Sequence, residues 1–223
     1  MVIGVHGQMG AGKDITGKII QYLTQKNGWT KISLDEILTY PPVLLQPAST
    51  NWEIKKYAWK LKQCVSLITG IPLSDLEDDE VKDSYLDLPW NKPSDELNPG
   101  MDPRMTVREL LQQFGTEGSR SIHPNFWVNA LFADYQAINS PQWIITDVRF
   151  MNELQAIEAR GGFVIKVFRD APKIVNNGRY NKKTHSSETE LNDHRFKYNI
   201  NNNFDIKTLV KNVKEILIEN NII

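Results

Sequence analysis

Residues 2–20 read VIGVHGQMGAGKDITGKII, an apolar run followed by a glycine-spaced loop and then by a helical pattern. From Gly7 to Lys13 the spacing is G-x-x-x-x-G-K, and the flanks predict a strand before the loop and a helix after it. Glycines let the backbone curl so that amide N–H groups converge on phosphate oxygens, and the helix adds the positive end of its dipole. A glycine-rich turn can also simply join a strand to a helix. The spacing, the lysine and both flanks together favour phosphate binding.

The residue after the loop lysine is unusual. In a phosphate-binding loop of this kind that residue is normally Ser or Thr, whose hydroxyl binds Mg²⁺. Here it is Asp14. A carboxylate is also a hard oxygen ligand, so we expect Asp14 to bind Mg²⁺ directly or through water. The substitution points to particular kinases with this loop and away from GTPases.

Bulk composition is that of a soluble globular protein. The chain has 223 residues, 40% of them hydrophobic and 24% charged, which fits one domain. A formal net charge of −1 creates no general attraction for nucleic acid or an anionic membrane. The single cysteine, Cys64, excludes an intramolecular disulfide and fits a reducing compartment. No apolar run is long enough to cross a bilayer, and the first residues predict a strand and not a signal peptide. We therefore expect a cytoplasmic protein with no membrane partner and no direct nucleic-acid binding.

Apolar periodicity predicts alternating strands and helices along most of the chain. The expected strands cover residues 2–6, 29–34, 142–146, 163–168 and 198–200, and the expected helices cover 12–26, 54–68, 106–114, 128–135, 151–160 and 206–217. Ser74–Glu77 and Thr106–Glu109 have the pattern of capping boxes, and Gly115 is expected to end the helix that Thr106 begins. Residues 170–190 are polar and aperiodic, which predicts a flap beside the site. The alternation predicts an α/β fold with a parallel sheet covered on both faces.

Charged residues follow one predicted strand at its carboxyl end, where open parallel sheets bind ligands. Asp147 is expected to help hold magnesium, and Arg149 to grip a second phosphate with its guanidinium fork. An isolated D-x-R pair is more often a surface ion pair, but the glycine loop favours a functional role here. Glu153 lies one helical turn beyond Arg149, where it can orient that arginine or accept a hydrogen bond from a sugar or base.

A second group of candidates follows the helix that begins at Thr106. Thr116 and Arg120, beyond Gly115, are in a position to reach a phosphate. Trp127 offers a flat face on which a base could stack, or a side chain for the core, and the sequence leaves both open.

Three further candidates carry weaker signals. Arg169 leaves a predicted strand just before the flap and is a candidate contact for ATP phosphates. Lys82 is a possible source of positive charge, although a solvated helix face is its default role. Thr184–Glu188 holds one histidine with no second histidine or cysteine nearby, which argues against a zinc site.

Taken together, these motifs resemble the phage-type deoxynucleoside monophosphate kinases. The resemblance spans Met1 to about residue 200 and rests on five motifs in order: GKD at 12–14, LLQQFGTE at 110–117, FWV at 126–128, DVR with NE at 147–153, and THSSE at 184–188. It implies a three-layer nucleoside monophosphate kinase fold in one domain, with a helical substrate-binding insertion over about 35–140 and a lid over about 170–190. It also implies Mg²⁺-dependent transfer of the ATP γ-phosphoryl group to a deoxynucleoside monophosphate, for deoxynucleotide supply in phage DNA synthesis in the host cytoplasm.

The resemblance also assigns roles to residues. Lys13, Arg149 and Asp147 would be catalytic, and Asp14 and Asp147 would hold the metal. By position, Lys13, Asp14 and Thr16 would match the family's ATP contacts, and the deoxynucleotide pocket would contain Arg120, Trp127, Asp147, Arg149 and Glu153, with Lys82 as an addition. From their place in the sequence, we also expect Gly10, Gly12, Ile15 and Arg169 to contact ATP, and Gly115 and Thr116 to contact the deoxynucleotide. This chain departs from the family pattern at Ile15, where a threonine is usual, and at Gln8 and Met9, where some relatives carry a basic residue.

Two alternatives stay open at this point. One is another small-molecule kinase with the same loop, acting on dephospho-coenzyme A or phosphomevalonate. The other is an ATP-binding component of a DNA-handling complex, although the balanced charge argues against it. The sequence fixes neither the accepted bases, nor the choice between ribose and deoxyribose, nor the number of subunits, and a homodimer is compatible with it.

Overall fold

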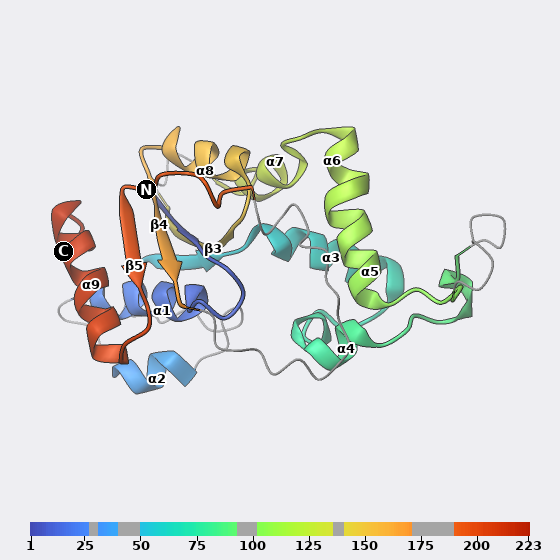
Figure 1. The fold of residues 1–223 in the computed structure, drawn as a ribbon, viewed down its shortest axis with the longest axis horizontal. Helices are drawn as coiled ribbons and strands as arrows, with labels where there is room; N and C mark the ends of the chain where they lie inside the picture. Colours follow the sequence, from blue (N-terminus) through green and yellow to red (C-terminus); the bar gives the residue numbers. More distant parts are fainter. Residues whose placement is uncertain (27–30, 40–49, 93–101, 136–140, 171–189) are drawn as a thin grey trace. The chain divides into compact units, whose positions relative to one another are not determined.

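A computed structural model describes residues 1–26, 31–39, 50–92, 102–135, 141–170 and 190–223 (Figure 1). The chain divides into two compact units. The sheet unit comprises residues 1–57 and 132–223, and the helical unit comprises residues 58–131.

Among the described residues, five parallel strands form the sheet, in the order β2-β3-β1-β4-β5. Their bounds are β1 (Val2–His6), β2 (Trp52–Lys55), β3 (Gln142–Val148), β4 (Phe163–Phe168) and β5 (Tyr198–Asn201). In this order the first strand of the chain, β1, is central. Its side chains are apolar, as expected for a strand that is covered on both faces of the sheet. The predicted α/β fold with a parallel sheet is confirmed.

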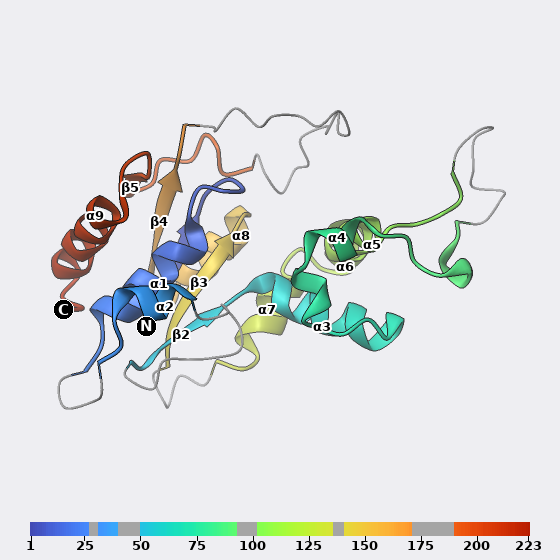
Figure 2. The same cartoon turned by 90° about the horizontal axis from the view of Figure 1, so that it is seen from below.

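Helices cover both faces of this sheet. They are α1 (Lys13–Leu23), α2 (Leu34–Thr39), α8 (Met151–Glu158) and α9 (Ile206–Glu219). Ile3 and Val5 of β1 share a core with residues of α1 and α9, and Figure 2 shows α9 beside β5. Gly4 points to the opposite face, where the side chain of Ile157 from α8 packs closely against its Cα. Side chains alternate across a strand, so this pattern yields three layers.

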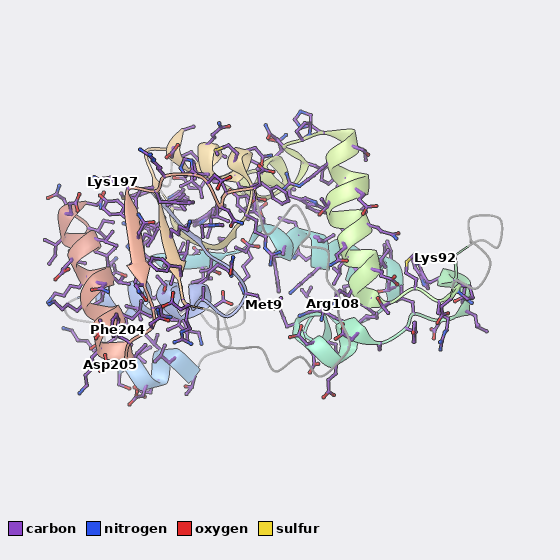
Figure 3. All side chains as sticks on the ribbon, viewed as in Figure 1. Met9, Lys92, Arg108, Lys197, Phe204 and Asp205 are labelled. Carbon is purple, nitrogen blue, oxygen red and sulfur yellow. The ribbon has the colours of Figure 1, made fainter. Side chains whose placement is uncertain are left out.

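The helical unit has a core of its own. Its helices are most of α3 (Tyr57–Thr69), α4 (Asp79–Asp83), α5 (Val107–Gln112), α6 (Ser119–Ile122) and most of α7 (Phe126–Phe132). Val65, Leu76, Val107 and Leu110 form the buried centre of this unit. Arg108, labelled in Figure 3, joins α5 to α4 through ion pairs with the carboxylates of Asp83 and Asp79.

The capping box at Thr106 is confirmed. The Thr106 hydroxyl accepts from the Glu109 N–H at 3.1 Å, and the Glu109 carboxylate accepts from the Thr106 N–H at 2.8 Å. The capping box at Ser74 is wrong, because Ser74 makes no such bond and only a 3₁₀ turn follows it. Asp78 begins the next helix instead, accepting from the N–H of Glu80 at 2.7 Å.

Two strand predictions need correction. Residues 29–30 lie outside the described residues, residues 31–33 form no strand, and Leu34 begins α2. Ile54 was placed at the start of a helix but belongs to β2, and α3 begins only at Tyr57. Ile54 fits both patterns. Together with Trp52, two residues earlier, it has the alternating burial of a strand, and it also fits the helical period of the residues that follow.

Gly115 does not end a helix as predicted. A π-helical segment, Gln113–Gly118, continues α5 directly into α6. A Cβ at Gly115 would meet the side chain of Leu61. The glycine therefore allows α3 to approach this helix closely. In the sequence, a glycine required for such packing cannot be distinguished from a glycine that ends a helix.

In the part of the chain that the structure describes, no helix has the length and apolarity to cross a membrane.

Candidate functional site

The glycine-rich loop, residues 7–12, joins β1 to α1 as the sequence predicts. Gly10 and Gly12 have φ values of 77° and 102°, in the left-handed region that side chains rarely adopt. Met9 is 68% exposed on this loop and is labelled in Figure 3. Lys13 begins α1, and its ammonium donates to the Gln8 carbonyl oxygen at 2.9 Å. The lysine therefore folds back over the loop whose amides are expected to bind phosphate.

Asn202 holds the loop from the end of β5. Its side-chain amide is buried and donates to the Ala11 carbonyl oxygen at 2.8 Å. The same amide nitrogen lies where a Cβ on Gly12 would have to be. The Asn202 carbonyl oxygen accepts from Arg169 Nε at 2.7 Å. Arg169, a predicted ATP contact, is thus connected to the loop through one residue.

Asp14 lies in the first turn of α1 and accepts two bonds on one oxygen. Thr146 of β3 donates to Asp14 Oδ1 at 2.7 Å, and the Lys56 ammonium lies 3.0 Å from the same atom. Burial tends to raise the pKa of Asp14, but the charge of Lys56 and the bond from Thr146 outweigh it and hold the pKa below its usual value. Asp14 is therefore ionised at neutral pH, as a metal ligand must be.

Asp147 and Arg149 lie at the carboxyl end of β3 and just beyond it. Asp147 Oδ1 accepts from the Tyr57 N–H at 2.9 Å. The Arg149 N–H donates to Glu153 Oε2 at 2.8 Å, and Glu153 also accepts from the Phe150 N–H at 3.1 Å. Through these two bonds the carboxylate of Glu153 caps α8 and fixes the backbone of Arg149. The side chain is buried, because Glu153 is only 3% exposed.

Electrostatics shows which of these side chains are neighbours. Burial lowers the pKa of Lys13, and the positive charge of Arg149 lowers it further, whereas Asp14 and Asp147 act in the opposite direction. The charges of Arg149, Asp14 and Asp147 thus all act on Lys13, in the region where β1 and β3 end. Such an arrangement suits a ligand with several negative charges.

The two remaining predicted ATP contacts on α1 differ in exposure. Ile15 is 41% exposed, whereas Thr16 is fully buried and its hydroxyl donates to the Gly12 carbonyl oxygen at 3.0 Å. The Thr16 hydroxyl is thus engaged inside the helix.

Five predicted substrate contacts lie in the helical unit. Trp127 is 5% exposed, and its indole N–H donates to the Gly115 carbonyl oxygen at 2.6 Å. Trp127 is therefore packed within the helical unit, and its predicted contact with a base stays a prediction. Thr116 is half-buried in the π-helical segment, and Arg120 Nη1 donates to the Pro124 carbonyl oxygen at 3.2 Å. Lys82 is paired with Asp79 at 2.9 Å on α4.

Three residues that contact the site were not predicted: Lys56, Thr146 and Asn202. Lys56 and Asn202 directly follow the parallel strands β2 and β5, and Thr146 lies in the last three residues of β3, so a correct strand assignment would have indicated their region of the sheet. For Lys56 the signal was lost because β2 was not recognised.

No group of three or more His, Cys, Asp or Glu side chains is arranged to hold a metal within the described ranges. The predicted flap lies outside the described residues, except for residues 170 and 190.

Comparison with known proteins gives one family. The model of the family described as deoxynucleotide monophosphate kinase matches residues 47–213, which is more than half of the chain. This region includes Lys56, Asp147, Arg149 and Asn202, but not the glycine-rich loop. A search of curated proteins finds no match.

Proposed function

This chain belongs to the deoxynucleotide monophosphate kinase family, and from that premise we propose that it transfers the γ-phosphoryl group of ATP to a deoxynucleoside monophosphate. The enzyme is a phosphotransferase of this family. We propose in addition that the phosphate donor is ATP. The reaction would convert a dNMP and ATP to a dNDP and ADP.

The main support within the molecule is the closeness of Lys13 to Arg149. These cations come from different strand ends, and the pKa of Lys13 is lowered by burial and by the positive charge of Arg149. A bound anion between them would relieve that repulsion. Phosphoryl transfer brings two anionic groups together, so a donor and an acceptor phosphate both need such neutralisation.

The residues then divide the work. Lys13 and the glycine-rich loop hold the ATP phosphates, with Arg169 as a further contact near the loop. Arg149 holds the acceptor phosphate, and Glu153 positions Arg149 through its backbone N–H. The acceptor phosphate is already ionised near neutral pH, so no strong general base is required.

The chemistry of the carboxylates fits Mg²⁺. Asp14 and Asp147 supply the hard oxygen ligands that Mg²⁺ prefers, and Asp14 is held in its ionised form. These two residues would hold the ion, with phosphate oxygens and water as its other ligands. When bound, Mg²⁺ supplies positive charge that neutralises the transferring phosphoryl group.

In the helical unit, we keep Arg120 and Thr116 as proposed contacts of the acceptor nucleotide. Gly115 and Trp127 support them through the packing of the helix that carries them, since Trp127 donates to the Gly115 carbonyl oxygen. Lys82 is the weakest of these proposals because its ammonium is already paired with Asp79.

A coupled assay of ADP production tests the proposal. The purified protein is given ATP and Mg²⁺ with each of the four common deoxynucleoside monophosphates, and separately with their ribonucleotide counterparts. We expect ADP to form only when an acceptor is present, and we expect Arg149→Lys to raise the KM for that acceptor because a single ammonium lacks the guanidinium fork. Equal ADP production with and without every acceptor would contradict the proposal and indicate an ATPase.

A further inference from the structure

Lys56 is the residue of the site whose position the proposed reaction does not yet explain. It follows β2 directly, and its ammonium lies 3.0 Å from Asp14 Oδ1. The side chain of Lys56 is 15% exposed, against 48% for Asp14. Ordering and desolvating a long lysine is unfavourable, and an exposed partner such as Asp14 offsets it only in part. A structural ion pair alone is therefore a weak reason for this arrangement.

The contacts of the next residue point the same way. Tyr57 donates its N–H to Asp147 Oδ1 at 2.9 Å. The consecutive residues Lys56 and Tyr57 thus contact both carboxylates that we assign to Mg²⁺. Thr146 donates to Asp14 as well, so Asp14 Oδ1 has two donors, one of them a cation.

Binding of a metal to Asp14 changes this balance. A divalent cation at Asp14 repels the ammonium of Lys56, which must then find another anion. Lys56 lies close enough to Lys13 for its charge to lower the pKa of that lysine. Lys13 is the residue that holds the ATP phosphates under the proposed function. A lysine has a flexible stem and three donors, so a short movement suffices to reach a phosphate oxygen.

We propose that Lys56 is a phosphate-binding residue whose ammonium occupies Asp14 in the nucleotide-free protein and moves to an ATP phosphate oxygen when Mg²⁺ takes the carboxylate. This inference rests on the proposed function. It assigns to Lys56 two exclusive partners, a carboxylate before binding and a phosphate after it.

The test uses two binding measurements that need no turnover. The first measurement gives the affinity for Mn²⁺, which serves as the probe for the metal. Protein without nucleotide is added to Mn²⁺, and electron paramagnetic resonance follows the Mn²⁺ that remains free. ATP binding is measured by calorimetry at saturating Mg²⁺ and without an acceptor. The variants are Lys56→Met and Lys56→Arg. Lys55→Met is the matched control, because the Lys55 ammonium pairs with Glu53 at 2.7 Å and not with Asp14.

The two measurements should change in opposite directions in Lys56→Met. Mn²⁺ should bind about three- to fivefold more tightly, because Asp14 loses a competing cation. ATP at saturating Mg²⁺ should bind about tenfold more weakly, because a charge-assisted hydrogen bond to phosphate is lost. Lys56→Arg should restore ATP binding to within about threefold of wild type, and Lys55→Met should leave both affinities unchanged.

If Lys56 had a purely structural role, Lys56→Met would bind both Mn²⁺ and ATP more weakly. Either that result or two unchanged affinities would overturn this inference. The proposed function would still be supported by acceptor-dependent kinase activity of the wild-type protein. Absence of any ATP binding or acceptor-dependent ADP production by the wild-type protein would instead overturn the proposed function, and this inference with it.

Discussion

Asn202 and Ala11, 191 residues apart in the sequence, are joined by a hydrogen bond of 2.8 Å from a buried side-chain amide to a main-chain carbonyl oxygen. The last strand of the sheet therefore fixes the first loop of the chain. Since the Ala11 carbonyl is within the glycine-rich loop, this bond limits how far the loop can move when its amides are without a ligand.

Replacement of Asn202 by Ala should lower the free energy of unfolding by about 1–3 kcal/mol, because the Ala11 oxygen loses a buried donor. It should also weaken ATP binding, because the loop is less ordered before binding. Urea unfolding and calorimetric titration with ATP measure the two effects. Asn199→Ala is the control, since Asn199 lies on β5, which Asn202 directly follows, and its side chain donates to the nearby Phe196 carbonyl oxygen. Equal effects of the two variants on ATP affinity would contradict the assigned role.

The two left-handed glycines of the loop should respond differently to a methyl group. Gly12→Ala should cost more stability than Gly10→Ala, because a Cβ at Gly12 meets the Asn202 amide, whereas a Cβ at Gly10 meets nothing within 4 Å. Backbone strain alone should cost about 1–2 kcal/mol in each variant. The difference in free energy of unfolding between the variants isolates the contact, and a difference near zero would mean that Asn202 moves aside without cost.

Lys13 should be indispensable for transfer. Lys13→Met should lower kcat by roughly 100- to 1,000-fold, because a preorganised cation on the transferring phosphoryl group is lost. The coupled ADP assay provides the measurement. Lys18→Met, in the same helix, should retain near-normal turnover because the Lys18 ammonium donates to the Leu38 carbonyl oxygen. Comparable rates for wild type and Lys13→Met would rule out the central role of this lysine.

Glu153 should act through Arg149. Glu153→Ala removes the acceptor of two N–H groups at the start of α8, so the free energy of unfolding should fall by about 1–2 kcal/mol. The KM for the deoxynucleotide should rise, because Arg149 is no longer fixed. Glu153→Gln keeps an acceptor oxygen and should recover most of the affinity, whereas Glu158→Ala, at the exposed end of the helix, should change neither quantity. A normal acceptor KM in Glu153→Ala would leave Glu153 with a structural role only.

His6 should make stability depend on pH. Burial lowers the pKa of His6 from 6.5, and Lys166, Lys13 and Arg149 add to that effect, against a bond of 2.9 Å to the Val148 carbonyl oxygen. The folded protein thus favours the neutral ring. Its contribution to stability is present above pH 6.5 and is lost as the pH falls from 6.5 through the folded pKa.

Urea unfolding at about pH 7.5 and about pH 5.5 tests this prediction. The wild-type protein should lose more free energy of unfolding between these two conditions than His6→Asn, which cannot titrate there. His123→Asn, which alters an exposed histidine of the helical unit, should keep the wild-type difference. The same loss in His6→Asn as in wild type would show that other groups cause the pH dependence.

The sequence was most informative where one local pattern has one structural solution. The loop between β1 and α1, the capping box at Thr106 and the acidic end of β3 were all predicted, because each depends on neighbours within a few residues. Gly115 shows the limit of this reasoning. A glycine after an amphipathic run usually ends a helix, but here the requirement came from Leu61 on another helix.

The contacts of the site depend on strand order, which local patterns do not contain. Lys56 reaches Asp14 because it follows β2, which lies beside β3. Asn202 reaches Ala11 because the loop that contains Ala11 follows β1, which is central in the sheet. Glu153 was predicted to orient Arg149 or to bind a ligand. The structure shows that Glu153 accepts from the backbone N–H of Arg149, and both predicted roles stay predictions.

The close approach of Asn202 to Gly12 also constrains how this family can diverge. A side chain at the position of Gly12 requires the asparagine at the position of Asn202 to shift or to be replaced by a smaller residue, so we expect substitutions at the two positions to occur together.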